Sequence, residues 1–355
     1  MPVSAPNATT ATVHDMPAPI DGRRVPRTMK AVQVRAFGGL DAMVCSDLPV
    51  PVPGAGQLLV RVFAAGVGNW DALVREGRSA LKQPLPLVLG SDLSGVVVAI
   101  GADVTGVAVG DAVYGVTNAR FVGAYAGFAV ADAAMIAAKP KRLSHAEAAS
   151  VPVVAVTAWQ MLFDRARMEA GQRVLVLGGA GNVGGYAVQL AAWKGGVVTA
   201  TASADQAALV QSLGAGQVAD ARTGALDALG RSFDVVIDAV GGATQDRALD
   251  LVRPGGIIVS AVAAPDPDHV ARCGVRADDI LVSVTTAVLQ DLAALIDAGR
   301  LTVRVGEVLP LSQARTAHEM LAGRPHKPGK IVLLPPDDGV PRTGATTDEG
   351  TRHAP

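Results

Sequence analysis

From Arg173 onward, short β-branched apolar runs alternate with longer segments that have a helical pattern of apolar residues. The runs predict strands at 173–178, 197–201, 217–219, 233–238, 256–262 and 279–284. The segments between them predict helices near 183–194, 204–213 and 243–251, with a weaker helix at 224–229. Alternation of this kind is typical of a doubly wound parallel sheet.

The first part of the chain follows a different pattern. Short apolar runs predict strands at 29–34 and 57–64, and valine-rich segments punctuated by glycine fill the region 87–114. Short strands joined by glycine turns predict a compact, barrel-like β domain. After a helix over 286–298, a strand, a helix and a strand are expected to return the chain to this domain, at 301–305, 312–322 and 330–334.

Between the two regions, Ser144 and Glu147 have the spacing of a capping box, which starts a helix. We expect Pro152 to break that helix and a second helix to begin at Thr157.

The glycine-rich stretch after the first strand of the second region is the main candidate for chemistry. Gly179, Gly181 and Gly184 have the spacing of a dinucleotide fingerprint. The first glycine permits a tight turn, the second lets backbone approach a pyrophosphate, and the third lets helix pack closely on strand. Asn182 and Val183 open the helix, whose free N–H groups favour an anion. The alternative is an ordinary glycine-rich turn between strand and helix.

Composition narrows the class of protein. The 355 residues suffice for two domains, and a formal net charge of −1 without a basic cluster argues against nucleic acid as a partner. The two cysteines lie far apart, which excludes a disulfide framework and favours the cytoplasm. The sequence has no apolar run long enough for a membrane span and no pattern typical of a signal peptide. Segments 1–28 and 335–355 have the composition of disordered tails.

Ordered motifs carry a family resemblance between residues 29 and 334. Besides the glycine turn, they lie at 64–71, 89–97, 109–115, 156–159, 212–215, 234–238 and 329–333. In this order they resemble the zinc-free quinone oxidoreductase (zeta-crystallin-like) branch of the medium-chain dehydrogenase/reductase superfamily. The resemblance implies an α/β fold: a GroES-like β-barrel domain at 29–151 and 286–334, and a doubly wound Rossmann domain at 152–285. The active site is then expected in the cleft between them.

The same family resemblance argues against a catalytic zinc ion. Zinc-dependent relatives carry a cysteine and a histidine near positions that here hold Gly68, Asn69 and Ser91. A catalytic zinc requires thiolate or imidazole ligands, and the four-cysteine structural lobe is also missing. We therefore expect no zinc in the active site.

The end of the second strand bears on the choice of nicotinamide cofactor. An NAD site commonly offers a carboxylate there for the ribose 2′-hydroxyl, whereas this chain has Ser203 and no carboxylate before Asp205. The lysine and tyrosine of NADPH-binding relatives are replaced by Gln206 and Ala221. Arg222 is the nearest replacement cation, or else a solvated surface arginine. We expect NADPH, with Ser203, Gln206 and Arg222 at its 2′-phosphate.

The resemblance also supplies candidates around the nicotinamide. Thr157 matches a threonine placed against that ring, although it also fits a helix N-cap. Val240 and Ala261 follow strands at the sheet edge where ligands bind, and Lys330 lies in the last shared motif.

On the substrate side, the family's usual asparagine and tyrosine align with Gly68 and Leu73, which leaves Asn69 and Trp70 to line the cleft. Asp71 and Asp92 match acidic family positions and are candidates either for fixing loop backbone or for catalysis. The proton for a reduced product is expected from water or from a tyrosine such as Tyr114 or Tyr125, both of which also fit a packed core.

The sequence as a whole predicts a homodimeric, zinc-independent, NADPH-dependent reductase of quinones or α,β-unsaturated carbonyls. Two alternatives stay open: an enoyl or enone reductase dedicated to one pathway, and a non-catalytic NADPH-binding redox sensor.

Overall fold

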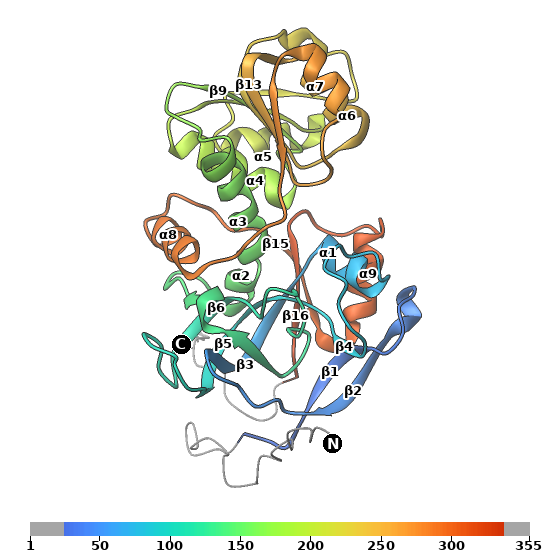
Figure 1. The fold of residues 1–355 in the computed structure, drawn as a ribbon, viewed down its shortest axis with the longest axis vertical. Helices are drawn as coiled ribbons and strands as arrows, with labels where there is room; N and C mark the ends of the chain where they lie inside the picture. Colours follow the sequence, from blue (N-terminus) through green and yellow to red (C-terminus); the bar gives the residue numbers. More distant parts are fainter. Residues whose placement is uncertain (1–24, 337–355) are drawn as a thin grey trace, which may run out of the picture.

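The computed structural model describes residues 25–336, and Figure 1 shows two lobes joined by a group of helices. The tails expected at 1–28 and 335–355 lie almost wholly outside the described residues. No described helix has the length and apolarity needed to cross a membrane.

The upper lobe in Figure 1 is built on a parallel sheet of six strands in the order β11-β10-β9-β12-β13-β14. The strands are β9 (Arg173–Leu177), β10 (Val197–Thr201), β11 (Gln217–Ala219), β12 (Phe233–Asp238), β13 (Val252–Ser260) and β14 (Arg276–Asp279). The helices are α4 (Asn182–Trp193), α5 (Ala207–Ser212), α6 (Gly242–Leu249) and α7 (Pro267–Cys273). This is the predicted doubly wound sheet.

The last strand of this sheet differs from its prediction. The apolar run at 279–284 lies mostly after the strand, and β14 is formed instead by residues 276–279, which are charged except for Ala277. Its register follows from backbone pairing with β13, where Ile257 lies opposite Arg276. An edge strand can be polar because its side chains face solvent.

The lower lobe contains a seven-stranded sheet with the path β15-β16-β3-β5-β6-β8, and β7 pairs with β3. Its strands are β3 (Gln57–Val67), β5 (Asp92–Ile100), β6 (Ala112–Val116), β7 (Phe128–Asp132), β8 (Ile136–Ala138), β15 (Val305–Pro310) and β16 (Lys330–Leu334). A smaller sheet pairs β1 (Thr28–Val34) with β2 (Met43–Pro49) and β4 (Leu87–Val88). The return of β16 to this lobe confirms the expected path of the chain.

Two elements of this lobe differ from the predictions. Strand β15 begins at Val305, so the predicted strand at 301–305 is an extended approach to it. Helix α1 (Asn69–Arg75) was not predicted, whereas α9 (Ala314–Leu321) lies within the helix expected at 312–322.

The helices between the lobes begin with α2 (His145–Ala149), whose capping box is confirmed. Pro152 does not end a helix and instead occupies the first turn of α3 (Pro152–Trp159). A proline is favourable there because the first turn leaves its N–H groups without intrahelical partners. Thr157 therefore lies inside α3 rather than at its start, and the helix continues into a π-helical turn at Gln160–Arg165. Helix α8 (Thr286–Asp297) packs beside α3.

Candidate nucleotide site and interdomain cleft

The turn after β9 depends on Gly178 for its conformation. Gly178 has a φ of +76°, in the left-handed region that favours glycine, whereas Gly179 does not. The tight-turn role predicted for Gly179 therefore belongs to Gly178. Gly179 is instead needed for packing, because a Cβ there would lie 2.8 Å from the Cβ of Ala200. Both backbone N–H groups bind Thr201, one to its side chain and one to its carbonyl.

The next two glycines position the start of α4. A Cβ on Gly184 would lie 2.0 Å from the carbonyl oxygen of Gly178, so only glycine lets the helix begin so close to the strand. Gly181 is the N-cap of α4 and is exposed, and a Cβ there would have its nearest neighbour 3.2 Å away. Asn182 is also exposed and Val183 is half-buried. The turn thus offers open backbone and the positive end of a helix, which fits a pyrophosphate.

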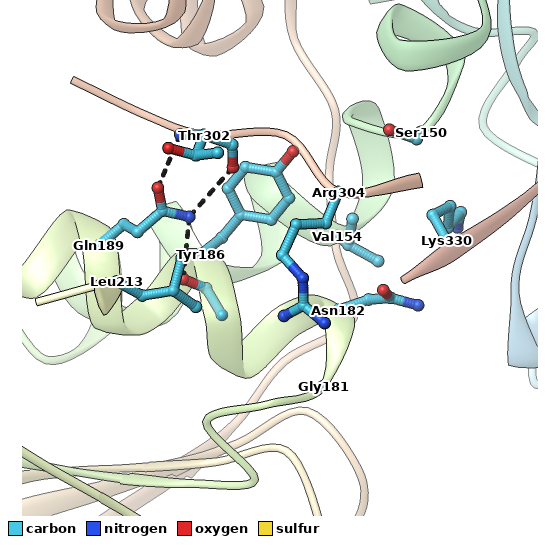
Figure 2. A pocket seen from close by; sticks show the side chains of 11 residues that line it. Ser150, Val154, Gly181, Asn182, Tyr186, Gln189, Leu213, Thr302, Arg304 and Lys330 are labelled. Carbon is cyan, nitrogen blue, oxygen red and sulfur yellow. Dashed lines mark hydrogen bonds between the residues drawn. The ribbon is translucent and has the colours of Figure 1, made fainter. Parts of the chain in front are cut away.

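A pocket of about 20 Å³ opens beside this turn, between α4 and the segments that lead to β15 and β16 (Figure 2). It is lined by Ser150, Val154, Gly181, Asn182, Gly185, Tyr186, Gln189, Leu213, Thr302, Arg304 and Lys330. Gln189 holds the approach to β15 in place, since its side chain donates to the Thr302 carbonyl and accepts from the Thr302 N–H. The pocket therefore brings the predicted candidates Gly181, Asn182 and Lys330 together.

Arg304 and Tyr186 are two polar residues of this pocket that the sequence did not single out. The Arg304 guanidinium, whose side chain is labelled in Figure 2, is half-buried and donates to the carbonyl oxygen of Ala180 at 3.3 Å. Within residues 25–336 it has no carboxylate partner, and burial lowers its pKa. The buried Tyr186 hydroxyl has no hydrogen-bond partner among the described residues. A half-buried cation beside the positive end of a helix is stabilised when an anion binds there.

The residues predicted at the ribose 2′-phosphate are only partly available. Ser203 and Gln206 lie together, with the Ser203 hydroxyl donating to Gln206 Oε1 at 3.0 Å. Arg222 is paired instead with Asp220, at 3.0 Å through Nε and 2.7 Å through Nη2. This pairing lowers the pKa of Asp220 to about 2.

The nicotinamide is expected at the carboxyl ends of β12 and β13, and the buried Asp238 side chain holds the backbone there. Its Oδ1 accepts from the N–H groups of Val240 and Gly241, at 3.0 and 2.9 Å. Its Oδ2 accepts from Ser260 Oγ and Gln245 Nε2. Val240 is left exposed and Ala261 half-buried at this edge. Asp238 thus holds the backbone at both predicted residues, because its main-chain carbonyl also accepts from the Ala261 N–H.

Thr157 lies on α3 and Trp70 lies on α1, and neither lines this pocket. The buried Thr157 hydroxyl donates to the carbonyl oxygen of Val153 within α3 at 2.7 Å. The Trp70 indole donates to Ser91 Oγ at 3.1 Å, and its ring occupies the space that a side chain on Gly68 would need. Asn69, the first residue of α1, is exposed.

The acidic candidates form a buried network. Asp71 Oδ2 accepts from the Tyr125 hydroxyl and from the Gly68 N–H, each at 2.9 Å. Asp92 Oδ2 lies 3.0 Å from Lys330 Nζ, and its Oδ1 accepts from the Val153 N–H. Burial raises the pKa of both carboxyl groups, that of Asp71 to about 7.

Lys330 also lies over the Trp70 ring, with Nζ 4.1 Å from the ring centroid. The Asp92 and Lys330 side chains are both almost completely buried.

Tyr114 lies away from this network. Its ring is fully buried, and its hydroxyl donates to the carbonyl oxygen of Leu289 on α8 at 2.5 Å. Burial raises the pKa of this hydroxyl. The contact speaks against its predicted part as proton donor and favours the alternative of core packing.

Comparisons with known proteins agree with this architecture. Residues 54–141 match the alcohol dehydrogenase GroES-like domain, and residues 213–333 match a family described as zinc-binding dehydrogenase. The chain is 33% identical over 323 residues to the NADPH-dependent alkenal/one oxidoreductase of Arabidopsis thaliana, across 88% of this chain and 81% of the relative. It is 31% identical over 325 residues to the quinone oxidoreductase of Sus scrofa, across 87% and 98% of the two chains.

A solved structure shows the same relationship. The quinone oxidoreductase of Coxiella burnetii superposes with a TM-score of 0.79 at 33% identity, over 86% of this chain and 99% of that one. The chain belongs to the medium-chain dehydrogenase/reductase superfamily. Within it, these similarities support the quinone oxidoreductase branch.

Membership confirms the predicted fold class of this dehydrogenase/reductase, with a GroES-like domain and a Rossmann-like parallel sheet. It also confirms an oxidoreductase that uses a nicotinamide cofactor and a small-molecule substrate. The individual site residues and the domain bounds remain predictions.

Proposed function

We propose that this oxidoreductase transfers hydride from NADPH to a quinone or an α,β-unsaturated carbonyl without zinc. The observation that carries the proposal is the open glycine turn at Gly181, with α4 behind it and the Arg304 guanidinium beside it. Backbone N–H groups and an unneutralised cation make this pocket suited to a dinucleotide pyrophosphate.

Zinc independence is supported by the residues at the family's ligand positions. Gly68 has no side chain, and the Ser91 hydroxyl is engaged by the Trp70 indole. Neither residue supplies the thiolate or imidazole that catalytic zinc requires.

The preference for NADPH is supported by the end of β10. Ser203 and Gln206 provide polar groups there, and no residue from Thr201 to Ala204 is acidic. Arg222 is 74% exposed, so it can turn from Asp220 to a phosphate at little cost in packing. The name of the Arabidopsis relative agrees with this preference.

The cofactor would supply the hydride, and the protein would supply position and a dry surface. Asp238 holds the backbone of Val240 and Gly241 by two hydrogen bonds, so this segment is already positioned before a ligand binds. Tyr114 and Tyr125 are buried, and their hydroxyl groups already donate hydrogen bonds to the Leu289 carbonyl and to the Asp71 carboxyl group. We therefore assign the product proton to solvent water.

We further propose a homodimer joined through the Rossmann sheet. Strand β14 ends the order of that sheet, so its outer edge offers backbone groups for pairing with a second copy. Light scattering coupled to size-exclusion chromatography tests this, and a monomer at micromolar concentration would contradict it.

The experiment that tests the function uses purified, metal-stripped protein. Fluorescence titrations with NADPH and NADH are followed by oxidation assays with 1,4-benzoquinone, 9,10-phenanthrenequinone and an alkenal, with and without added Zn²⁺. We expect tighter binding of NADPH and turnover that does not depend on zinc. Binding of neither nucleotide would reject the cofactor site, and binding without turnover on any acceptor would favour the redox-sensor alternative.

Arg222→Ala tests the 2′-phosphate contact separately. We expect it to weaken NADPH binding more than NADH binding, because only NADPH carries that phosphate. Equal losses for both nucleotides would remove Arg222 from the site.

A further inference from the structure

A second group of chemically active side chains lies on the upper lobe, away from the cleft. Among residues 25–336, Asp250, His269 and Cys273 place three possible metal-ligand atoms within 4.8 Å of one another. His269 and Cys273 belong to α7, and Asp250 is the C-cap of the neighbouring helix α6 (Figure 1). These residues play no part in the proposed hydride transfer.

The spacing of the two α7 residues suits a shared ligand. Residues four apart on a helix lie on one face, and this spacing is used by paired metal ligands in other proteins. Asp250 Oδ1 faces the pair, at 2.9 Å from His269 Nε2 and 3.4 Å from Cys273 Sγ. One carboxylate oxygen therefore lies between an imidazole and a thiol.

We propose that Asp250, His269 and Cys273 form a binding site for a borderline-soft divalent cation, Zn²⁺ being the best match. Sulfur, imidazole nitrogen and carboxylate oxygen are the three ligand types of protein zinc sites. A thiolate and a carboxylate together balance the two charges of the cation. The site is separate from the family's catalytic zinc position, which lies at Gly68 and Ser91 in the other lobe.

The two distances to the Asp250 oxygen require only a small adjustment, and the imidazole nitrogen and the sulfur lie within 4.8 Å of each other. Zinc–ligand bonds of about 2.0 to 2.3 Å in a tetrahedron place neighbouring ligand atoms about 3.4 to 3.6 Å apart. The observed 3.4 Å between oxygen and sulfur is near that range, and the 2.9 Å between oxygen and nitrogen would widen by about half an ångström. The Asp250 side chain is 67% exposed and can make this movement.

The surroundings leave the fourth coordination position open to water. His269 is 19% exposed and Cys273 is half-buried, so the cation has a path to all three ligands. The Arg231 guanidinium is held by the carbonyl groups of Val252 and Cys273. An ion at this place would join the end of α6 to α7, which are otherwise held there by side-chain packing and hydrogen bonds.

The test is a Co²⁺ titration of the metal-stripped full chain, followed by displacement with Zn²⁺. The absorption spectrum of bound Co²⁺ shows which ligands it has. A thiolate ligand gives a thiolate-to-metal charge-transfer band, and four-coordinate geometry gives strong visible bands. The chain has two cysteines, so Cys273→Ser and the matched control Cys45→Ser divide the possible sources of that band. We expect a one-to-one complex in the wild type and in Cys45→Ser, bleached by Zn²⁺, and no charge-transfer band in Cys273→Ser.

Asp250→Asn provides a second variant, at a side chain that is 67% exposed. We expect it to retain the charge-transfer band but to bind Co²⁺ at least about tenfold more weakly. Zn²⁺ should raise the melting temperature of the wild type and leave that of Cys273→Ser unchanged. No charge-transfer band in the wild type, a band that survives in Cys273→Ser, or equal melting shifts in both proteins would overturn the proposal.

Discussion

The glycine turn and the buried network around Asp92 border the same pocket, at Gly181 and Lys330, but they are built by different means. The turn places its backbone with glycines between Gly178 and Gly184, whose missing side chains let strand and helix approach. The network consists of four ionisable side chains that come from separate parts of the chain: Asp71, Asp92, Tyr125 and Lys330. One wall is therefore specified locally, and the other exists only after the fold has formed.

The difference predicts how each wall responds to change. A substitution at Gly181 alters binding, because this residue of the turn is exposed and a Cβ there would have its nearest neighbour 3.2 Å away. A substitution in the network alters stability, because a buried charge that loses its partner has no water to replace it.

The largest effect is expected from Lys330→Met. This change leaves Asp92 buried without its counter-ion and should lower the free energy of unfolding by about 3–5 kcal/mol. The double variant Asp92→Asn with Lys330→Met removes both charges and should recover most of that loss. Urea unfolding curves measure both, and equal destabilisation of the single and double variants would show that the ion pair is not the cause.

Gly181→Asp should act on binding alone. The new carboxylate would face the pyrophosphate, and a like-charge contact of this kind weakens binding at least about a hundredfold. Gly39→Asp is the matched control, since Gly39 lies in the other lobe, is exposed, and a Cβ there meets no atom within 4 Å. Fluorescence titration with NADPH should show normal affinity in the control. Normal affinity in Gly181→Asp as well would place the nucleotide elsewhere.

Asp71→Asn should change the pH dependence of stability. The pKa of Asp71 rises on folding from 3.8 to about 7, so the folded chain holds this proton more tightly than the unfolded chain does. Its contribution is therefore fully present below pH 3.8 and is lost as the pH rises to about 7.

Asparagine keeps one oxygen for the Gly68 N–H and the Tyr125 hydroxyl, which both bind Oδ2. Unfolding free energies measured between pH 4 and pH 8 should thus fall less steeply in Asp71→Asn than in the wild type. Parallel curves for the two proteins would contradict the assignment of this titration to Asp71.

The smallest effect is expected from Arg304→Ala. Loss of the guanidinium beside the glycine turn should weaken NADPH and NADH by the same factor, about tenfold, because both carry the pyrophosphate. Arg300→Ala, at an exposed position of the same segment, is the control. A loss confined to NADPH would instead place Arg304 at the 2′-phosphate.

The two walls also differ in how well the sequence predicted them. The spacing of Gly179, Gly181 and Gly184 located the turn, although it assigned the tight conformation one residue late, because consecutive glycines fit the motif equally well. The network was not predicted as a unit. Tyr125 and Asp71 are 54 residues apart in sequence, and local pattern carries no information on which distant side chains meet.

Other misses have similar physical reasons. Pro152 reads as a helix breaker, yet it is favourable in the first turn of α3, and only the structure shows on which side of it the helix lies. Strand β14 has no apolar pattern because its position depends on pairing with β13. Arg304 belongs to no motif, and its role follows from the carbonyl of Ala180 beside it.

Strand β16 follows all other described strands in the sequence, yet it pairs with β3 near the middle of the lower sheet and contributes Lys330 to Asp92. During synthesis every strand of the parallel sheet leaves the ribosome before β16 does. We therefore expect a nascent chain that holds a folded nucleotide lobe while β3 lacks a neighbour at Ala65–Val67 and Asp92 lacks its counter-ion. In limited proteolysis of ribosome-stalled chains, the lower lobe should stay cleavable until residue 334 has emerged. The upper lobe should already be protected in the shorter chains. The order of translation would thus make the barrel, although it begins first, the last part of the protein to become stable.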